Sequence, residues 1–218
     1  AMSDIGLAAF SVFFMGSPSF LASQTALAAG QGRSNCQTLF GMGKIPTDNY
    51  IRLMLDGASP AAFDGLFGQA IAAAGPMEPF QCLGGRRLIA LDGTEHFNSR
   101  KIHCAQCLTR KRADGGTEYY HSFLGATLVA PGHAQVMPLP PEFIVPQDGA
   151  EKQDCERNAA KRWLARHGPG LAHLRPVYLG DDLFACQPIA EAIQQAGGSF
   201  ILTCKPSSHT TIEEYLYG

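Results

Sequence analysis

Two apolar stretches, each ending on an aspartate, constrain the fold of this chain more than any other feature. The first is "RRLIALD", which ends at Asp92, and the second is "RPVYLGDD", which ends at Asp181 and Asp182. Short apolar runs of this kind are typical of strands that cross a core. Open α/β sheets bind ligands beyond the carboxyl ends of their strands. The sequence therefore predicts two strands that deliver carboxylates to one edge of a sheet.

The elements around these two strands follow an α/β order. Strands are predicted at 86–92, 117–131, 134–145, 175–181 and 199–205, and helices at 151–168 and 186–198. Prolines within 134–145 suit an edge strand. Because helices separate the later strands, we expect those strands to be parallel.

The first eighty residues carry helix signals instead. Apolar runs at 4–15, 17–30 and 59–75 are joined by "KIPTDNYIRLMLDG", and most have a Ser or Thr start and a Gly stop. Pro76 and Pro79 then mark a boundary. We expect a small all-helical N-terminal domain over 1–80 and an α/β domain, a mixed sheet with flanking helices, over 81–218.

Composition limits the functional classes. The chain has 218 residues, 45% of them hydrophobic and 17% charged, which suits a globular protein with a core. Its formal net charge of −2 gives no global attraction to nucleic acid or membranes. The apolar stretch at 5–16 is well short of the roughly twenty residues that a membrane-spanning helix needs. Seven cysteines, an odd number, do not indicate a disulfide framework. We therefore expect a cytoplasmic protein without a membrane partner.

Two neighbouring strands that each end on an acid can share a divalent metal. Mg²⁺ prefers oxygen ligands and keeps waters for substrate phosphates. Two such ions roughly 4 Å apart hold both the attacking and the leaving oxygen of a phosphoryl transfer. The alternative is that Asp92 opens a turn before Gly93 and that Asp181 caps the next helix. The occurrence of both acids in this strand order favours the metal site.

Longer strings of the chain resemble DDE-type transposases of bacterial insertion sequences. They include "LIALDGTEHFNSRKIHC", "LPPEFIVPQDG", "EKQDCE", "YLGDDLFACQPI" and "CKPSSH". The resemblance implies a ribonuclease H-like core that cleaves and joins double-stranded DNA at element ends, with Mg²⁺ or Mn²⁺ on Asp92 and Asp181. Relatives follow the second acid with Arg-Gly and an aromatic residue. Here Asp182, Leu183 and Phe184 follow, so either Asp181 or Asp182 is the second ligand.

The family's third acid is a Glu on a helix well beyond the last core strand. Glu213 and Glu214 come too early to match it, so we expect a transposase fragment with two of the three metal ligands. One alternative is a non-catalytic remnant that binds DNA or a partner. Another is a haloacid-dehalogenase-like phosphatase. The string "LDGT" resembles the nucleophile loop of that family, although Thr94 stands where the family has a second acid.

The string "KIHCAQCLTRKR" predicts a zinc site. Cys104 and Cys107 form a C-x-x-C pair, which supplies half of a tetrahedral zinc site. The remaining ligands would come from His121, Cys155, His103 or His96. The alternative is a hairpin turn with two unliganded thiols. We expect structural Zn²⁺, with Cys104, Cys107, His121 and Cys155 as candidate ligands.

Basic residues gather in two places. Arg110, Lys111 and Arg112 follow the cysteine pair, and Lys161 and Arg162 lie on a predicted helix. Phosphate contacts need charge concentrated locally, so these residues are candidates for DNA binding. The alternative for the helix is a solvated face. The N-terminal domain has few basic residues, and a homodimer contact suits it at least as well as DNA binding.

Overall fold

The computed structural model describes residues 1–30, 33–75, 77–146 and 154–217. Its chain divides into two compact units, Ala1–Asp64 and Gly65–Gly218. The boundary predicted from the sequence lies at residue 80. Pro76, which helped to mark it, is outside the described residues. No helix in the described ranges is long and apolar enough to cross a membrane.

The first unit is built from short helices. They are α1 (Met2–Phe14), α2 (Phe20–Ala28), α3 (Arg33–Thr38), α4 (Asp48–Leu55) and the 3-10 turn η1 (Pro60–Phe63). Side-chain caps begin two of them: the Ser19 hydroxyl accepts the Ala22 N–H, and the Thr47 hydroxyl accepts the Tyr50 N–H. Such caps satisfy N–H groups that the helix itself leaves unbonded. A small core holds the unit together, formed by Ile5, Ala8, Cys36, Phe40, Met42 and Ile51.

The second unit contains all the strands. Its helices are α5 (Asp64–Ala73), η2 (Glu78–Phe80), α6 (Glu156–Leu171), η3 (Ala172–Leu174), α7 (Gln187–Gln195) and α8 (Thr210–Tyr217). Its strands are β1 (Gln81–Cys82), β2 (Arg86–Ser99), β3 (Leu108–Lys111), β4 (Thr117–Val129), β5 (Met137–Pro138), β6 (Glu142–Ile144), β7 (Pro176–Gly180) and β8 (Ser199–Leu202).

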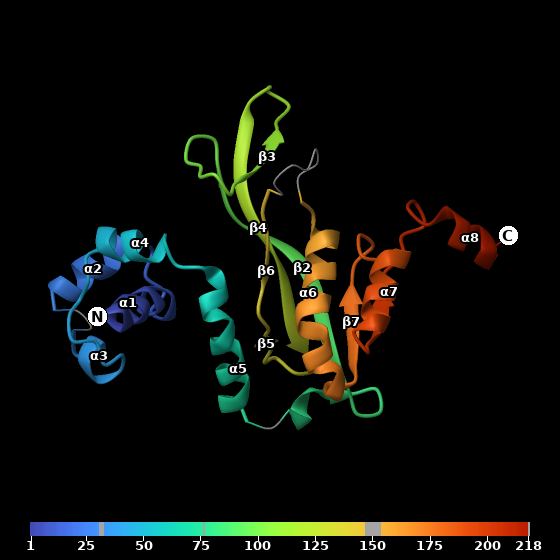
Figure 1. Cartoon of the computed structure of the whole chain (residues 1–218), viewed down its shortest axis with the longest axis horizontal. Coiled ribbons are helices and arrows are strands. Elements are labelled where there is room, and N and C mark those ends of the chain that lie inside the picture. Colours follow the sequence, from blue (N-terminus) through green and yellow to red (C-terminus); the bar gives the residue numbers. More distant parts are fainter. Residues whose placement is uncertain (31–32, 76, 147–153, 218) are drawn as a thin grey trace. The chain divides into compact units, whose positions relative to one another are not determined.

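The strands form one mixed sheet in the order β3-β4-β2-β7-β8 (Figure 1). β2 is antiparallel to β4 and parallel to β7, and β7 is parallel to β8. The short strands extend this path: β1 pairs with β2, and β5 and β6 pair with β4. The predicted mixed α/β sheet with flanking helices is confirmed, including the parallel late strands.

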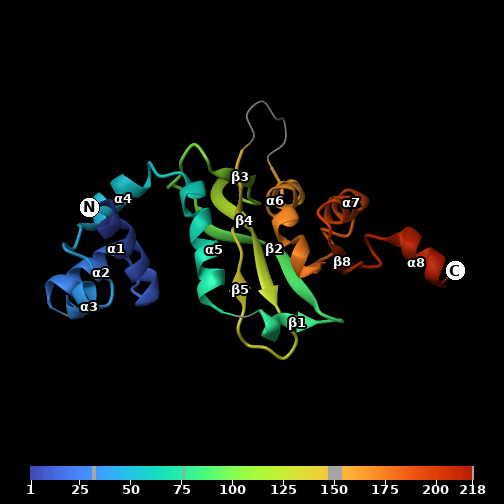
Figure 2. The ribbon, with the colours of Figure 1, turned by 60° about the horizontal axis from the view of Figure 1, so that its bottom comes forward.

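Helix α6 covers one face of the sheet and packs beside α7 (Figure 2). Alternate residues of β4 are buried, so Leu124 and Ala126 face the helix. Trp163 of α6 is fully buried, and its Nε1 donates a 2.6 Å hydrogen bond to the Pro140 carbonyl. The core of the unit therefore lies between α6, α7 and this face of the sheet.

Two predicted strands differ from the observed ones. The strand expected to end at Asp92 continues to Ser99, because the long β4 pairs with it along its whole second half. The strand expected over 134–145 is split into β5 and β6. Pro140 and Pro141 separate the two pieces, since proline has no N–H to donate to a neighbouring strand.

Candidate functional site

Asp92 and Asp181 lie at the same level of two neighbouring strands. The parallel pairing of β2 and β7 ends with Ala90 beside Leu179, and each aspartate is two residues further on. Because β7 ends at Gly180, the edge of β2 beyond this point has no neighbouring strand on that side. Side chains from both faces of β2 can therefore approach the same position around this edge.

A third carboxylate, that of Glu156, comes from α6 and lies near enough to Asp92 and Asp181 for their charges to act on it. Glu156 stands in the first turn of that helix, and its carboxyl group lies against Gly93 so closely that a Cβ at Gly93 would collide with it. Burial raises the pKa of Glu156, and the charges of Asp92 and Asp181 raise it further. The three acids thus form one electrostatic group.

This group has the chemistry of a hard-cation site. Carboxyl groups whose pKa is raised by burial and by nearby negative charges are common at functional positions. Among the described residues, no cationic side chain contacts Glu156. Carboxylate oxygens are the ligands that Mg²⁺ and Mn²⁺ prefer. A cavity of about 210 Å³ opens beside Glu156, with Tyr120 and Ser122 in its wall. Asp92 and Asp181 are not in its wall, and among the described residues the ligand atoms of the three acids do not lie within 4.8 Å of one another.

The two consecutive aspartates have different surroundings. Asp182 accepts hydrogen bonds from the Lys205 N–H at 2.7 Å and from the Ser208 hydroxyl at 2.6 Å, and His209 Nδ1 lies 3.0 Å from it. These contacts lower the pKa of Asp182, with the Ser208 bond as the largest cause. Among the described contacts, Asp181 accepts one hydrogen bond, from the Leu183 N–H, and its negative charge helps to raise the pKa of Glu156. Of the two, Asp181 belongs to the acidic group and Asp182 anchors the 203–209 segment.

Glu156 is not among the site residues that the sequence predicted. It lies inside the quoted string "EKQDCE", directly before the apolar part of the predicted helix 151–168. An acid in the first helical turn is ordinarily explained by the helix dipole. The usable signal was its position on the helix that precedes the second aspartate-bearing strand, since that helix has to pack on the strand carrying Asp92.

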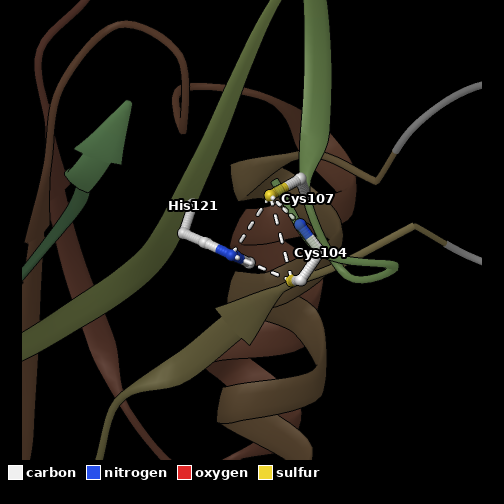
Figure 3. A group of neighbouring side chains, drawn as sticks. All are labelled: Cys104, Cys107 and His121. Atoms are coloured by element: carbon white, nitrogen blue, oxygen red, sulfur yellow. Dashed lines mark hydrogen bonds between the residues drawn. The ribbon is translucent and has the colours of Figure 1, made fainter. Parts of the chain in front are cut away.

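Cys104, Cys107 and His121 come together in a second candidate site (Figure 3). Both thiol sulfurs lie 3.3 Å from Nε2 of His121, and the two sulfurs are 3.9 Å apart. In a tetrahedral zinc site with Zn–S bonds of about 2.3 Å, two sulfurs are separated by about 3.8 Å. The Cys104 N–H donates to the Cys107 sulfur and the Gln106 N–H to the Cys104 sulfur, and burial raises the pKa of the Cys107 thiol. The group therefore has the residue types and spacing of a metal site.

The other proposed zinc ligands are placed differently. The His103 ring stacks on Tyr119 at 4.2 Å between centroids, and its Nδ1 lies 3.2 Å from the Lys101 carbonyl. Cys155 is the N-cap residue of α6. It does not belong to the group of Cys104, Cys107 and His121, whose ligand atoms lie within 4.8 Å of one another. His96 lies nearer, with its ring centroid 5.8 Å from that of His121.

Most of the predicted DNA-binding residues bond to neighbouring side chains. Arg110 pairs with Glu95 and Glu118, and Arg112 pairs with Glu118. Arg162 holds Glu142 at 2.8 Å and the buried Asp154 at 2.7 Å. Lys111 donates to the Thr117 hydroxyl at 3.0 Å, and Lys161 lies exposed on α6. Their role in DNA binding stays a prediction.

Comparisons of the chain with protein-family models, with curated proteins and with solved structures found no significant match.

Proposed function

We propose that this chain is the catalytic core of a DDE-type DNA transposase, which cleaves and transfers strands at the ends of an insertion sequence. The observation that supports the proposal most directly is that Asp92 and Asp181 stand at the same level of two neighbouring parallel strands, with Glu156 within reach of their charges. Three carboxylates at one edge of a sheet suit metal-dependent phosphoryl transfer better than any other chemistry that these residues offer.

The sheet order agrees with the ribonuclease H-like core that the sequence resemblance implies. Three antiparallel strands, β3, β4 and β2, are extended by the two parallel strands β7 and β8. The helix α6 enters this order between the two groups of strands and delivers Glu156. An all-helical N-terminal domain preceding this core is part of the same proposal.

The metal would be held by Asp92 and Asp181, with Glu156 as a third ligand or as the base that orients a metal-bound water. A bound Mg²⁺ or Mn²⁺ polarises the phosphate and lowers the pKa of a coordinated water. The protein's part is to fix the carboxylates: the strand pairing positions Asp92 and Asp181, and the fit against Gly93 positions Glu156. Glu156 supplies a carboxylate from a place where the resemblance did not anticipate one.

The phosphatase alternative is disfavoured by the course of β2. A phosphatase of that type needs its "LDGT" string to form a loop at the end of a strand. In this chain β2 continues through Asp92 and Thr94, and both residues pair with β4. The main-chain N–H groups of such a loop would therefore be committed to the sheet.

Zinc at Cys104, Cys107 and His121 completes the proposal as a structural cofactor. The two cysteines lie in the segment between β2 and β3, and His121 lies in the middle of β4. A zinc ion would therefore fix the segment between β2 and β3 to strand β4. Replacing Cys104 and Cys107 with Ser is expected to abolish binding of one zinc per chain, measured by atomic emission after dialysis.

The decisive experiment measures Mn²⁺ binding by electron paramagnetic resonance and Mn²⁺-dependent nicking of supercoiled DNA. Asp92→Asn and Asp181→Asn are expected to abolish both, and Glu156→Gln to weaken Mn²⁺ binding roughly tenfold. Asp182→Asn is the matched control, because its carboxylate is engaged with Lys205 and Ser208. Unchanged Mn²⁺ affinity in both Asp92→Asn and Asp181→Asn would refute the proposal. Mn²⁺ binding that is lost in both variants, in an original chain that does not nick DNA, would favour the non-catalytic alternative.

A further inference from the structure

The sheet face opposite α6 carries a continuous group of aromatic side chains. In β4, residues alternate between the two faces, and those facing away from α6 are half-buried. Directly paired residues of neighbouring strands share a face, which places Phe97 beside His121 and Phe143 beside Phe123. We call this surface the aromatic face and define it by His96, Phe97, Tyr119, His121, Phe123 and Phe143.

The rings of the aromatic face contact one another, except that of Tyr119, which stacks on His103, and all of them remain at least partly accessible. His96 lies 5.5 Å from Phe123 and 5.8 Å from His121 between ring centroids, and Phe123 lies 6.2 Å from Phe143. A bulge in β2 between Glu95 and Phe97 accounts for the position of His96, because the extra residue turns its side chain toward these rings. His96 is exposed, and Phe143 keeps 37% of its surface exposed.

Asp92 belongs to the same face. It pairs with Gly125, and the next pair on this side of the two strands is Thr94 with Phe123. Since alternate residues of a strand are roughly 7 Å apart, Phe123 lies one such step from the position opposite Asp92. Gly125 has no side chain, so nothing on β4 covers the carboxylate from directly across the pair. The aromatic face therefore leads up to the proposed metal site.

Charge distinguishes the aromatic face from the opposite one. Arg110 and Arg112 bond to Glu95 and Glu118, so these cations are neutralised within the protein. Lys111 pairs with Thr117, in step with Tyr119, and its ammonium bonds to the Thr117 hydroxyl with no carboxylate among its described contacts. Among the residues that β2, β3, β4 and β6 direct to this face, Asp92 is the one carboxylate. The surface thus combines exposed rings with an available cation.

We propose that the aromatic face binds a single strand of DNA through its unpaired bases and presents the backbone of that strand to Asp92. Every base has a flat ring face that stacks on aromatic side chains without regard to sequence. Bases within a duplex stack on each other and offer no such face, whereas an unpaired strand does. Lys111 then contacts a phosphate. The proposal rests on the proposed function for its choice of DNA and for the role of Asp92.

Fluorescence anisotropy with a labelled twenty-nucleotide thymidine strand tests this proposal. The full chain is used with zinc and without Mg²⁺ or Mn²⁺, so that the readout does not depend on the acidic group. Phe143→Leu and His96→Ala are each expected to weaken binding roughly tenfold, because each removes a stacking ring. Phe143→Tyr keeps the ring and is expected to bind within about twofold of the original chain. Lys111→Ala is expected to reduce the salt dependence by about one ion.

The matched control is Phe200→Leu. Phe200 lies on β8, away from the aromatic face, and is 39% exposed, close to the exposure of Phe143. Near-ultraviolet circular dichroism of each variant establishes that the packing around Trp163 is retained. Thymidine binding that is equal in Phe143→Leu, Phe143→Tyr and Phe200→Leu would overturn the proposal. So would a duplex of equal length that binds more tightly than the single strand, or a change of oligomeric state in Phe143→Leu without a change in DNA binding.

The outcome is separable from that of the metal experiment. If Phe143→Leu weakens strand binding and Asp92→Asn leaves Mn²⁺ binding intact, the aromatic face stands and the proposed catalytic site fails. If Mn²⁺ binding is lost in Asp92→Asn while the single strand binds equally to all aromatic variants, the catalytic site stands and the aromatic face fails.

Discussion

The two faces of β2 and β4 solve different physical problems with the same strands. The face toward α6 buries its apolar side chains and pairs its charges within the protein, as Arg162 does with Glu142 and Asp154. The aromatic face leaves its rings accessible, and among the described residues no carboxylate contacts Lys111. A buried polar group costs stability unless it is satisfied, whereas an accessible one is available to a ligand. The α6 face therefore serves stability, and the aromatic face is free to serve binding.

The proposed metal site lies where the two faces meet. Asp92 belongs to the aromatic face, Gly93 to the α6 face, and Glu156 reaches Gly93 from the helix. β7 ends at Gly180, so its pairing with β2 stops before Asp92, at the level where the metal is proposed to bind. The proposed site therefore depends on the α6 face for its geometry and on the aromatic face for access by a ligand.

The largest effect is expected from truncation on the α6 face. Trp163→Ala removes a fully buried ring and its hydrogen bond to the Pro140 carbonyl, and should lower the free energy of unfolding by about 3–5 kcal/mol. Phe143→Ala on the aromatic face should cost less than about 1.5 kcal/mol, because water already reaches that ring. Urea unfolding followed by far-ultraviolet circular dichroism measures both. Equal losses would contradict the distinction between the faces.

The charges of the α6 face are expected to show a smaller but clear effect. Arg162→Ala leaves the carboxylates of Glu142 and Asp154 without their main partner, and their side chains are 9% and 0% exposed. We expect a loss of about 2 kcal/mol, below the range for fully buried pairs because the Arg162 side chain is 37% exposed. Arg166→Ala is the control, since that arginine lies 3.4 Å from Glu142 and is 58% exposed. Its loss should stay below about 0.5 kcal/mol.

The sequence was informative where the structure depends on local patterns. Apolar runs predicted the strands that contain Ile89 and Tyr178, and their order predicted parallel pairing late in the chain. The C-x-x-C spacing and the candidate His121 identified the three residues that come together at the second site. These features follow from the spacing of a few residue types and need no knowledge of distant contacts.

The features that the sequence did not reveal depend on long-range pairing. Asp92 was expected at a strand end, and only the length of β4 explains why β2 continues past it. Glu156 meets Gly93 because α6 crosses the sheet at one particular level, which the helical pattern of α6 does not encode. The different surroundings of Asp181 and Asp182 likewise depend on Lys205 and Ser208, more than twenty residues further along.

A variant at the meeting point of the faces tests their dependence on each other. Gly93→Ala places a methyl group where the Glu156 carboxyl group lies, so the helix or the side chain has to shift. We expect Mn²⁺ binding to weaken roughly tenfold while the fold is retained. Gly170→Ala, on the same helix as Glu156, is the control, since a Cβ there would meet nothing within 4 Å. A Gly93→Ala protein with unaltered Mn²⁺ affinity would exclude Glu156 from the site.

The acidic group is also expected to make stability depend on pH. Burial and the charges of Asp92 and Asp181 raise the pKa of Glu156, so folding favours its protonated form. The stability that this proton confers is fully present below the unfolded pKa of Glu and is lost as the pH rises through the folded value. Without metal, Glu156→Gln should therefore raise the melting temperature at pH 7 more than at pH 4.

Mn²⁺ should reverse that order at pH 7 by stabilising the original chain more than the variant, because an ion that binds only the folded state adds to its stability. Differential scanning calorimetry at both pH values, with and without Mn²⁺, measures the four differences. A Glu156→Gln protein that gains as much from Mn²⁺ as the original chain would show that the carboxylate is strained for a reason other than metal binding.

The smallest effect is expected in the segment anchored by Asp182, which lies on neither face of β2 and β4. A hydrogen bond to the Ala185 carbonyl, aided by the charge of Asp182, raises the pKa of His209, and the Ser208 hydroxyl lowers that of Asp182. The His209 contribution is lost as the pH rises through its raised value, and the Asp182 contribution is lost as the pH falls through its lowered value. Protection of the 203–209 amides from hydrogen exchange should therefore be greatest in the interval between the two, near pH 5, and His209→Gln should remove its alkaline limit. An equal loss of amide protection at 203–209 in Asp182→Asn and Asp181→Asn would contradict the separate roles of the two aspartates, because Asp182 is the one that accepts the Lys205 and Ser208 hydrogen bonds.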